Sequence, residues 1–256
     1  MEFLVIIPAR YASERLPGKP LREIAGKTMI QHVYERATAS GAAGVVVATD
    51  DERIEKTVKS FGGDVCMTAS THRSGSERLA EVVALRGYRD EQIIVNLQGD
   101  EPLMPAELIR QVAQDLHGNR RADISTLCSR IHSAVELFDP HAVKVVLDAA
   151  GYALYFSRAP IPWDRDAFAV TTEQLPENCE HYRHVGLYAY RAGYLKQYIA
   201  LPSSPLERLE SLEQLRVLWH GGRIHVAEAK CFPGHGVDTP ADLEKAAKLL
   251  GEADFS

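Results

Sequence analysis

Cysteine is scarce in this sequence, and its few cysteines show no pairing pattern. The four of them, among 256 residues, are Cys66, Cys128, Cys179 and Cys231. They are widely separated and form no C-x-x-C pair, unlike the compact spacing of small secreted domains that disulfides hold together. We therefore expect reduced thiols with structural roles.

Long hydrophobic runs are equally absent. The first apolar run, residues 3–7, is short and follows the acidic Glu2. No stretch approaches the roughly 20 apolar residues that are needed to cross a bilayer. We expect a cytoplasmic protein without membrane insertion.

The sequence also lacks an excess of positive charge. Its 35 acidic residues outnumber its 29 lysines and arginines, which gives a formal net charge of −6. A protein that wraps nucleic acid needs a basic face for the phosphates, so the charge argues against nucleic acid as a partner. A single nucleotide can still bind to a local basic loop.

The glycine motifs of the two commonest nucleotide sites are missing. A P-loop requires G-x-x-x-x-G-K-[ST], but Lys19 is followed by Pro20 and has no matching upstream glycine. The dinucleotide fingerprint G-x-G-x-x-G is absent as well, and so are internal repeats and low-complexity tracts. These absences argue against a P-loop kinase or a dehydrogenase.

What the sequence does contain is an alternation of strand and helix patterns. Apolar, β-branched runs that predict strands buried on both faces occupy residues 3–7, 45–47 and 93–97. Helical spacing of apolar residues follows at 28–38, 52–61, 76–85 and 105–116. The alternation predicts an α/β protein with a Rossmann-like, mostly parallel sheet and flanking helices.

The pattern becomes mixed after about residue 120. Strands are predicted at 143–147, 153–156, 185–190 and 224–229, some of them antiparallel to the first set. Residues 160–181 are rich in Pro, Asp and Glu and indicate a loop or a small subdomain. We expect one domain over 1–256, with a smaller mixed α+β lobe within about 130–205.

A basic loop follows the first predicted strand. Arg10, Arg15 and Lys19 lie on it, at the carboxyl end of a parallel strand, where ligands bind in open α/β sheets. Fixed cations beside small residues suit a triphosphate, whose charge must be neutralised before a nucleophile reaches phosphorus. A solvated basic loop is the alternative.

Two acidic residues are candidate ligands for Mg²⁺. Asp100 follows the strand at 93–97, and Asp238 follows the strand at 224–229, so both can converge on the sheet edge that carries the basic loop. The alternative for each is a cap of a turn or helix. A helix is predicted to start directly after Asp238, because Thr239 and Pro240 are typical of its first positions.

The motifs resemble those of the 3-deoxy-manno-octulosonate cytidylyltransferases, or CMP-Kdo synthetases, over nearly the whole chain. The opening IIPARYASERLPGKP (6–20) carries the resemblance first. Further matching blocks are VATD (47–50), SGSERL (74–79), NLQGDEP (96–102), ALYFSR (153–158) with IP (161–162), LEQLR (212–216) and GVDTP (236–240). The resemblance implies a nucleotide-diphospho-sugar transferase fold and a homodimer built partly through the smaller lobe. It also implies the reaction of CTP with Kdo to give CMP-Kdo and pyrophosphate for lipopolysaccharide biosynthesis.

The same resemblance implies roles for individual residues. Its nucleotide contacts are the basic Arg10, Arg15 and Lys19 at the phosphates, with Ala9, Ser74 and Gly75 at the cytidine. Its metal ligands for Mg²⁺ are Asp100 and Asp238, which with Arg15 and Lys19 form the catalytic set. Its sugar contacts are Arg78, Gln98, Arg158, His184, Tyr188, Glu210 and Gln214.

Other interpretations of these residues stay open at this point. Glu207, Glu210 and Glu213 can form one solvated helix face, and Arg78 can be a surface cation. We do not expect a zinc site at His181 and His184, which lie three residues apart. A cytidylyltransferase for another acidic sugar, a hexose-1-phosphate nucleotidyltransferase and a non-catalytic nucleotide sensor remain as alternatives.

Overall fold

The computed structural model describes residues 1–12, 16–72, 74–177 and 180–253. Its strands are β1 (Phe3–Ala9), β2 (Glu23–Ile24), β3 (Lys27–Thr28), β4 (Gly44–Thr49), β5 (Asp64–Met67), β6 (Ile93–Asn96), β7 (Ile124–Arg130), β8 (Lys144–Leu147), β9 (Ala153–Ser157), β10 (Tyr182–Arg191) and β11 (Ile224–Glu228). The strand patterns predicted from the sequence all fall within this set.

The helices of the first half match the predicted helical patterns to within two residues at each end. The helices are α1 (Met29–Ala39), α2 (Glu52–Ser60), α3 (Gly75–Leu85), α4 (Ala106–Gly118), α5 (Ala134–Phe138), α6 (Ala167–Val170), α7 (Ala192–Tyr198), α8 (Pro205–Glu210), α9 (Gln214–Trp219) and α10 (Pro240–Ala253), with a 3₁₀ turn, η1 (Lys19–Leu21). Across the described ranges, no helix has both the length and the apolar character to cross a bilayer.

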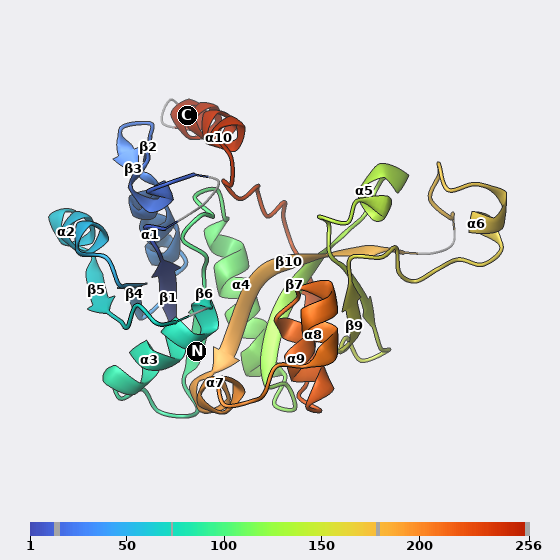
Figure 1. Ribbon diagram of the computed structural model, residues 1–256, viewed down its shortest axis with the longest axis horizontal. Coiled ribbons are helices and arrows are strands. Elements are labelled where there is room, and N and C mark those ends of the chain that lie inside the picture. The colour runs from blue at the N-terminus through green and yellow to red at the C-terminus, as the bar shows by residue number, and fades with distance from the viewer. Residues whose placement is uncertain (13–15, 73, 178–179, 254–256) are drawn as a thin grey trace.

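One large sheet organises the molecule. Within the described residues it has nine strands, and its main path runs β11-β7-β10-β6-β1-β4-β5 (Figure 1). β1 pairs in parallel with β4 and β6, β4 with β5, and β7 with β11, whereas β10 is antiparallel to both β6 and β7. The predicted mostly parallel sheet, with antiparallel strands in the second half, is confirmed.

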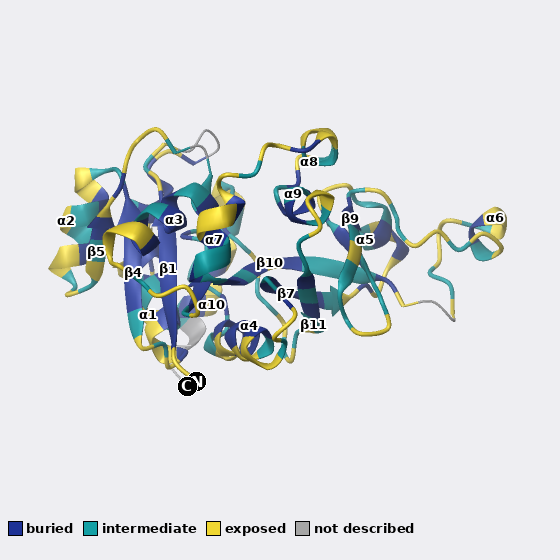
Figure 2. Ribbon diagram, turned by 90° about the horizontal axis from the view of Figure 1, so that it is seen from below, coloured by how far each residue is buried: buried dark blue, intermediate teal, exposed yellow. Residues whose placement is uncertain are grey.

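Helices cover both faces of the sheet, as the uninterrupted apolar strands require. Phe3, Val5 and Ile7 of β1 pack in one core cluster with α1 and α4, and Leu4 and Ile6 pack in the opposite cluster with α3 and α7. Because successive side chains of a strand point to opposite faces, a strand buried on both sides must be apolar throughout. Figure 2 shows β1 and β4 buried along their length between these layers.

The sequence analysis missed β7, although it lies between two other strands. Its sequence, ISTLCSR, is rich in hydroxyl groups and does not have the apolar character of a central strand. The structure explains how the hydroxyls are tolerated: Ser125 donates to the Val112 carbonyl at 2.7 Å, and Thr126 donates to the Leu187 carbonyl at 2.8 Å. A buried hydroxyl costs little when it finds such a partner.

The second half of the chain carries the smaller lobe. β8 and β9 form a hairpin beside β10, and α5 and α6 extend away from the main sheet (Figure 1). Residues 160–181, predicted as a loop or small subdomain, hold only the short α6 among the described residues. A cluster of Ile131, Leu137 and Phe168 forms the lobe's own small core.

A partly charged contact holds the edge strand β11 against α4. His225 of β11 makes an ion pair with Asp115 of α4, with Nδ1 and Oδ2 2.7 Å apart. The hydrogen bond with Asp115 raises the pKa of His225 above its usual value, although burial acts in the opposite direction. Tyr152 packs edge-on against the same imidazole, with ring centroids 5.1 Å apart.

This contact predicts a pH-dependent part of the stability. A histidine whose pKa is raised on folding stabilises the protein fully below its unfolded pKa of about 6.5, and the contribution is lost as the pH rises through the folded pKa. Asp115→Asn should therefore lower the free energy of unfolding by roughly 1–2 kcal/mol near pH 6, and by less near pH 9. Urea unfolding of the wild type and the variant at both pH values measures this difference in the free energy of unfolding. As a control, Asp166→Asn at an exposed position should have little effect at either pH. If Asp115→Asn lowered the free energy of unfolding equally at both pH values, the result would contradict the account.

Candidate functional site

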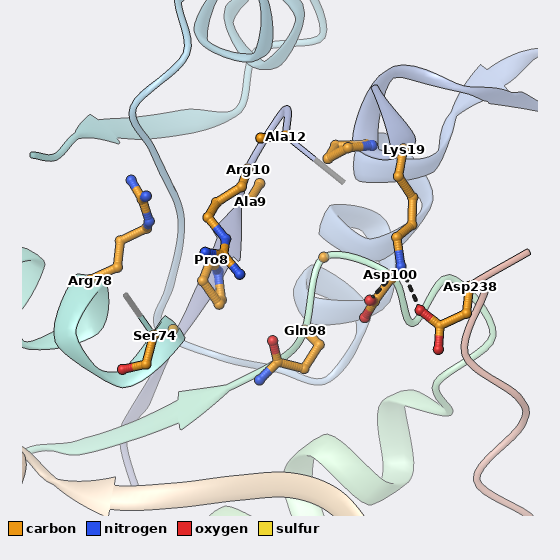
Figure 3. Close-up of a pocket in the computed structure, with 13 residues that line it drawn as sticks. Pro8, Ala9, Arg10, Ala12, Lys19, Ser74, Arg78, Gln98, Asp100 and Asp238 are labelled. Carbon is orange, nitrogen blue, oxygen red and sulfur yellow. Dashed lines mark hydrogen bonds and ion pairs between the residues drawn. The ribbon is translucent and has the colours of Figure 1, made fainter. Parts of the chain in front are cut away.

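A cavity of about 750 Å³ opens at the carboxyl ends of β1 and β6. Its lining residues are Pro8, Ala9, Arg10, Ala12, Lys19, Pro20, Ser74, Gly75, Arg78, Gln98, Gly99, Asp100 and Asp238 (Figure 3). The lining includes every predicted nucleotide and metal residue in the described ranges. Arg15, which was also predicted to bind the phosphates, lies outside the described residues.

The basic loop is shaped by Gly18, which precedes η1. Gly18 has a φ of 67°, a conformation that favours glycine, and its N–H donates to the Tyr11 carbonyl at 3.2 Å. A Cβ at this position would lie 3.1 Å from the Tyr11 ring. The Arg53 guanidinium also stacks on the Tyr11 ring, with its central carbon 3.3 Å from the ring centre. These contacts fix the point at which Lys19 leaves the loop.

Lys19 lies between the two predicted metal ligands. Its Nζ is 2.8 Å from Asp100 Oδ2 and 2.9 Å from Asp238 Oδ1 (Figure 3). Burial lowers the pKa of Lys19, but the charge of Asp100 and hydrogen bonds with both carboxylates outweigh it, so the pKa is raised overall. The ammonium is therefore protonated, and three charged groups from distant segments meet at one point.

The backbone and local caps hold the two carboxylates in place. The Val237 N–H donates to the Asp100 carbonyl at 2.8 Å and ties the two acidic segments together. The start of α10 is capped by reciprocal hydrogen bonds: Thr239 Oγ1 accepts from the Asp242 N–H at 3.3 Å, and the Asp242 carboxylate accepts from the Thr239 N–H at 2.9 Å. The helix therefore does not need Asp238 as its cap, and the carboxylate of Asp238 faces Lys19 instead.

A third carboxyl group beside this pair shows how crowded the negative charge is. Glu101 is half-buried beside the site, and its desolvation, together with the charges of Asp100 and Asp238, raises its pKa to about 8. Its Oε1 would lie 2.9 Å from a Cβ added at Gly236, so only glycine fits there without displacement. Close carboxyl groups of this kind favour a cation among them.

The turn that leads into α3 forms the opposite wall of the cavity. Ser74 caps α3 by accepting from the Glu77 N–H at 3.2 Å. Gly75 approaches Pro8 of β1 so closely that an added Cβ would lie 3.3 Å from the proline ring. Backbone groups at such a helix start are available to a ligand only where no side chain covers them.

Arg78 is 1% exposed, so its interpretation as a surface cation is wrong. Its guanidinium donates to Thr68 Oγ1 and lies 3.3 Å from Asp50 Oδ1. It lines the large cavity together with Ser74 and Gly75. The structure thus places Arg78 beside the predicted nucleotide residues, in a cavity that it shares with Gln98 of the other predicted sugar contacts.

A second cavity of about 130 Å³ adjoins the first one. Its lining residues are Ser76, Asn96, Gln98, Ile124, Tyr188, Tyr190, Tyr198, Glu213, Gln214 and Val217. Gln98 lines both cavities, so the two spaces meet at its side chain. Three predicted sugar contacts, Gln98, Tyr188 and Gln214, come together here.

Glu213 supplies the carboxylate among the described lining residues of the small cavity, and the sequence analysis did not select it as a site residue. Its Oε1 is buried and has no hydrogen-bond partner within the described part of the chain. Burial first, and then the charge of Glu213, raises the pKa of the Tyr198 hydroxyl. Glu213 precedes Gln214 in the LEQLR block, and that adjacency is the signal that could have identified it.

The interpretation of Glu207, Glu210 and Glu213 as one solvated helix face is wrong. α8 ends at Glu210, where Ser211 adopts a left-handed conformation with φ 52°, so the three residues do not share a helix. Glu207 accepts from Arg216 Nε at 2.9 Å and completes the capping box of α8. Each carboxylate therefore has a different environment.

Glu210 and Arg158 bond to each other and to the backbone. Glu210 Oε1 accepts from the Ser157 hydroxyl at 2.6 Å, and Oε2 accepts from the Arg158 N–H at 2.9 Å. Arg158 Nε donates to the Glu210 carbonyl at 2.7 Å, and Nη1 donates to the Pro140 carbonyl at 2.9 Å. Neither is among the described residues that line the two cavities. Their evident role is to join α8 to the smaller lobe.

His184 lies behind the small cavity, next to Tyr188. A shift of register between Val185 and Tyr188 marks a bulge in β10, and the two rings are 5.3 Å apart at their centres. Burial, and then the charge of Arg183, lowers the pKa of His184 to about 3, so the imidazole is neutral. Thr126 Oγ1 lies 3.0 Å from its Nε2. The neutral imidazole packs against the Tyr188 ring and helps to hold it in place.

The donor set at Lys19 fits a magnesium ion better than a transition metal. Oxygen atoms of two carboxylates converge there, and Mg²⁺ prefers such hard ligands. No cluster of three or more His, Cys, Asp or Glu side chains in the described ranges has the arrangement of a metal site. Further ligands must therefore come from water or from a bound molecule.

Comparisons with known proteins agree with this geometry. A family model described as "Cytidylyltransferase" matches residues 4–224. The chain is 58% identical over 252 residues to the 3-deoxy-manno-octulosonate cytidylyltransferase of Idiomarina loihiensis, covering 98% of this chain and 100% of that protein. A solved structure of CMP:2-keto-3-deoxy-manno-octonic acid synthetase complexed with CTP matches with a TM-score of 0.90 at 46% identity, covering 99% of this chain and 100% of that one. The predicted fold and resemblance are confirmed, and this chain belongs to the cytidylyltransferase family.

Proposed function

We propose that this protein transfers CMP from CTP to 3-deoxy-D-manno-octulosonate (Kdo), with release of pyrophosphate. One observation carries the proposal: a large cavity lined by cations and paired carboxylates meets a small polar cavity at Gln98. The arrangement provides adjoining places for a triphosphate and for a polyhydroxylated sugar. The comparisons identify those two molecules as CTP and Kdo.

The large cavity suits the nucleotide. Arg10 and Lys19 neutralise phosphate charge, and Ala9, Ser74 and Gly75 leave room for the base and ribose close to the backbone. Arg78 lies on the same wall and is held by Asp50 and Thr68, so it can add a fixed charge there. The protein's task at phosphorus is mainly to position groups and to balance charge.

Asp100 and Asp238 would hold Mg²⁺ in this proposal. The ion, when bound, would polarise phosphate oxygens and offset the charge that develops at phosphorus. Lys19 and Arg10 would offset charge on the departing pyrophosphate. The anomeric oxygen of the sugar forms a bond to the α-phosphorus and gives up its proton to solvent as the bond to pyrophosphate breaks, so no covalent enzyme intermediate is needed.

The small cavity suits the sugar. Gln98, Gln214 and Tyr188 offer donors and acceptors for hydroxyl groups, and Glu213 adds a buried acceptor. Gln98, on the boundary, would orient the sugar toward the α-phosphate. A site built to hydrogen-bond hydroxyl groups strongly rejects analogues that lack them.

We further propose a cytoplasmic enzyme that forms a homodimer and supplies lipopolysaccharide biosynthesis. CTP is a cytoplasmic nucleotide, and the family resemblance implies both the pathway and the dimer. The smaller lobe exposes large apolar side chains on α5, α6 and the adjoining loop: Val135 is 84% exposed, Trp163 55% and Val170 86%. A second copy of the chain would cover them, because large exposed apolar side chains gathered on one lobe are typical of an interface.

The activity is tested by measuring pyrophosphate release with CTP and Mg²⁺. Kdo, a sialic acid, glucose 1-phosphate and no sugar are compared in parallel. We expect release with Kdo alone, because a cavity built to hydrogen-bond one arrangement of hydroxyl groups rejects sugars that lack it. Release with a different sugar alone would overturn the substrate, and CTP binding without release in any well would contradict the enzymatic function.

The catalytic assignment predicts different kinetics for two substitutions. Asp100→Asn should lower kcat by about 100-fold or more, with a smaller rise in the KM for CTP, because it removes charge that acts mainly in the transition state. Lys19→Ala should raise the KM for CTP and also lower kcat, since its ammonium contacts the phosphates in both states. The exposed Glu91→Gln is the matched control. Full activity of Asp100→Asn with Mg²⁺ would rule out its role.

The dimer is tested by light scattering after size-exclusion chromatography. The wild type should have twice the mass of one 28.3 kDa chain. Val170→Glu should shift it toward the monomer by placing a charge in the interface. Leu85→Glu, at another exposed apolar position, at the end of α3, should remain dimeric. A monomeric wild type would refute the proposal.

A further inference from the structure

Lys19 and a divalent cation compete for the same oxygen atoms. The ammonium hydrogen-bonds Asp100 Oδ2 at 2.8 Å and Asp238 Oδ1 at 2.9 Å. Mg²⁺ binds oxygen at about 2.0–2.1 Å, so an ion held by both atoms would lie almost where Nζ lies. Two positive charges this close repel strongly in a partly buried site. The ion can bind there only when Lys19 leaves.

Lys19 is built so that its side chain can leave while its backbone stays. The Lys19 N–H donates to the Leu16 carbonyl at 3.1 Å, and Gly18 fixes the turn before it. The Lys19 side chain itself is flexible, and its ammonium has three N–H donors that can turn to new acceptors. The same side chain lines the large cavity, so phosphate oxygens placed there lie within its reach.

The number of ligands explains when the exchange is favourable. In the described residues two carboxylates contact the Lys19 ammonium, whereas Mg²⁺ demands near-octahedral coordination by oxygen. Without a triphosphate, the ion would have to displace a cation that already hydrogen-bonds both carboxylates. A triphosphate makes the replacement of Lys19 by the ion favourable in two ways. It gives the Lys19 ammonium a new anionic partner, and it gives the ion further oxygen ligands.

We propose that Lys19 couples the two binding events: it acts as an exchangeable counter-ion that keeps the divalent cation out until a triphosphate draws its ammonium away. The inference rests on the proposed function. Coupling of this kind is reciprocal, so the cation strengthens triphosphate binding by the same factor as the triphosphate strengthens cation binding. The enzyme thereby favours the complete metal–nucleotide complex over either component alone.

The experiment measures Mn²⁺ binding by electron paramagnetic resonance in the absence of sugar. We expect wild-type protein to bind Mn²⁺ weakly, and at least about fivefold more tightly with CTP than without it, after correction for Mn²⁺ bound to free CTP. Lys19→Met should bind Mn²⁺ more tightly than the wild type when no nucleotide is present, while its CTP affinity falls. Mn²⁺ binding by Lys19→Met that is no tighter than by the wild type would overturn the proposal.

Two controls separate the coupling from a general effect of charge. Arg10→Met removes a cation from the same cavity but not the one between the carboxylates (Figure 3), so it should weaken CTP binding and leave Mn²⁺ binding without nucleotide nearly unchanged. Adding Asp100→Asn to Lys19→Met should abolish the tighter Mn²⁺ binding. An Arg10→Met effect as large as that of Lys19→Met would contradict the specific role of Lys19.

Thermal unfolding covers the case in which Lys19→Met folds poorly. Two close carboxylates without their ammonium destabilise the variant, and Mn²⁺ should then raise its Tm more than that of the wild type, because a ligand stabilises the state that binds it. An equal shift in both proteins would count against the proposal. Neither measurement uses Kdo, so a wrong sugar assignment would leave these results unaffected.

Discussion

The contact of Lys19 with Asp100 and Asp238 is the constraint on which the site depends. The three residues are separated by 81 and 219 positions, yet their charged atoms meet within 3 Å. Parallel pairing of β1 with β6 brings the basic loop and Asp100 to one sheet edge, and the bond from Val237 to the Asp100 backbone brings Asp238 there. The fold thus concentrates charges that would repel or be solvated elsewhere.

The two cavities divide the chemistry between charge and hydrogen bonding. The large cavity gathers cations and carboxylates, as a triphosphate and a metal require. The small one is lined by amides, tyrosines and one carboxylate, and the neutral His184 lies behind it. Reaction at phosphorus requires charge balance, whereas sugar selection requires hydrogen-bond geometry. Because separate cavities meet these two requirements, the residues of one cavity can change without disturbing the other.

Much of the fold and of the charged site could be predicted from the sequence because those features are local. β1, β4 and β6 are continuous apolar runs, and Thr239 and Pro240 mark the start of α10. β7 could not be recognised, since its hydroxyls become acceptable only through carbonyls of α4 and β10. The sequence analysis did not select Glu213 for a related reason: the burial of its carboxylate oxygen depends on where α9 packs. Arg158 and Glu210 match the family motif, but the structure gives them bonds that tie α8 to the lobe.

The most direct test of the account is a crystal structure with CTP and Mn²⁺, in which anomalous scattering locates the metal. The account predicts the metal bound to both Asp100 and Asp238, with the Lys19 ammonium moved from the carboxylates to a phosphate oxygen. A metal bound elsewhere, or Lys19 still between the two carboxylates with CTP in place, would contradict it.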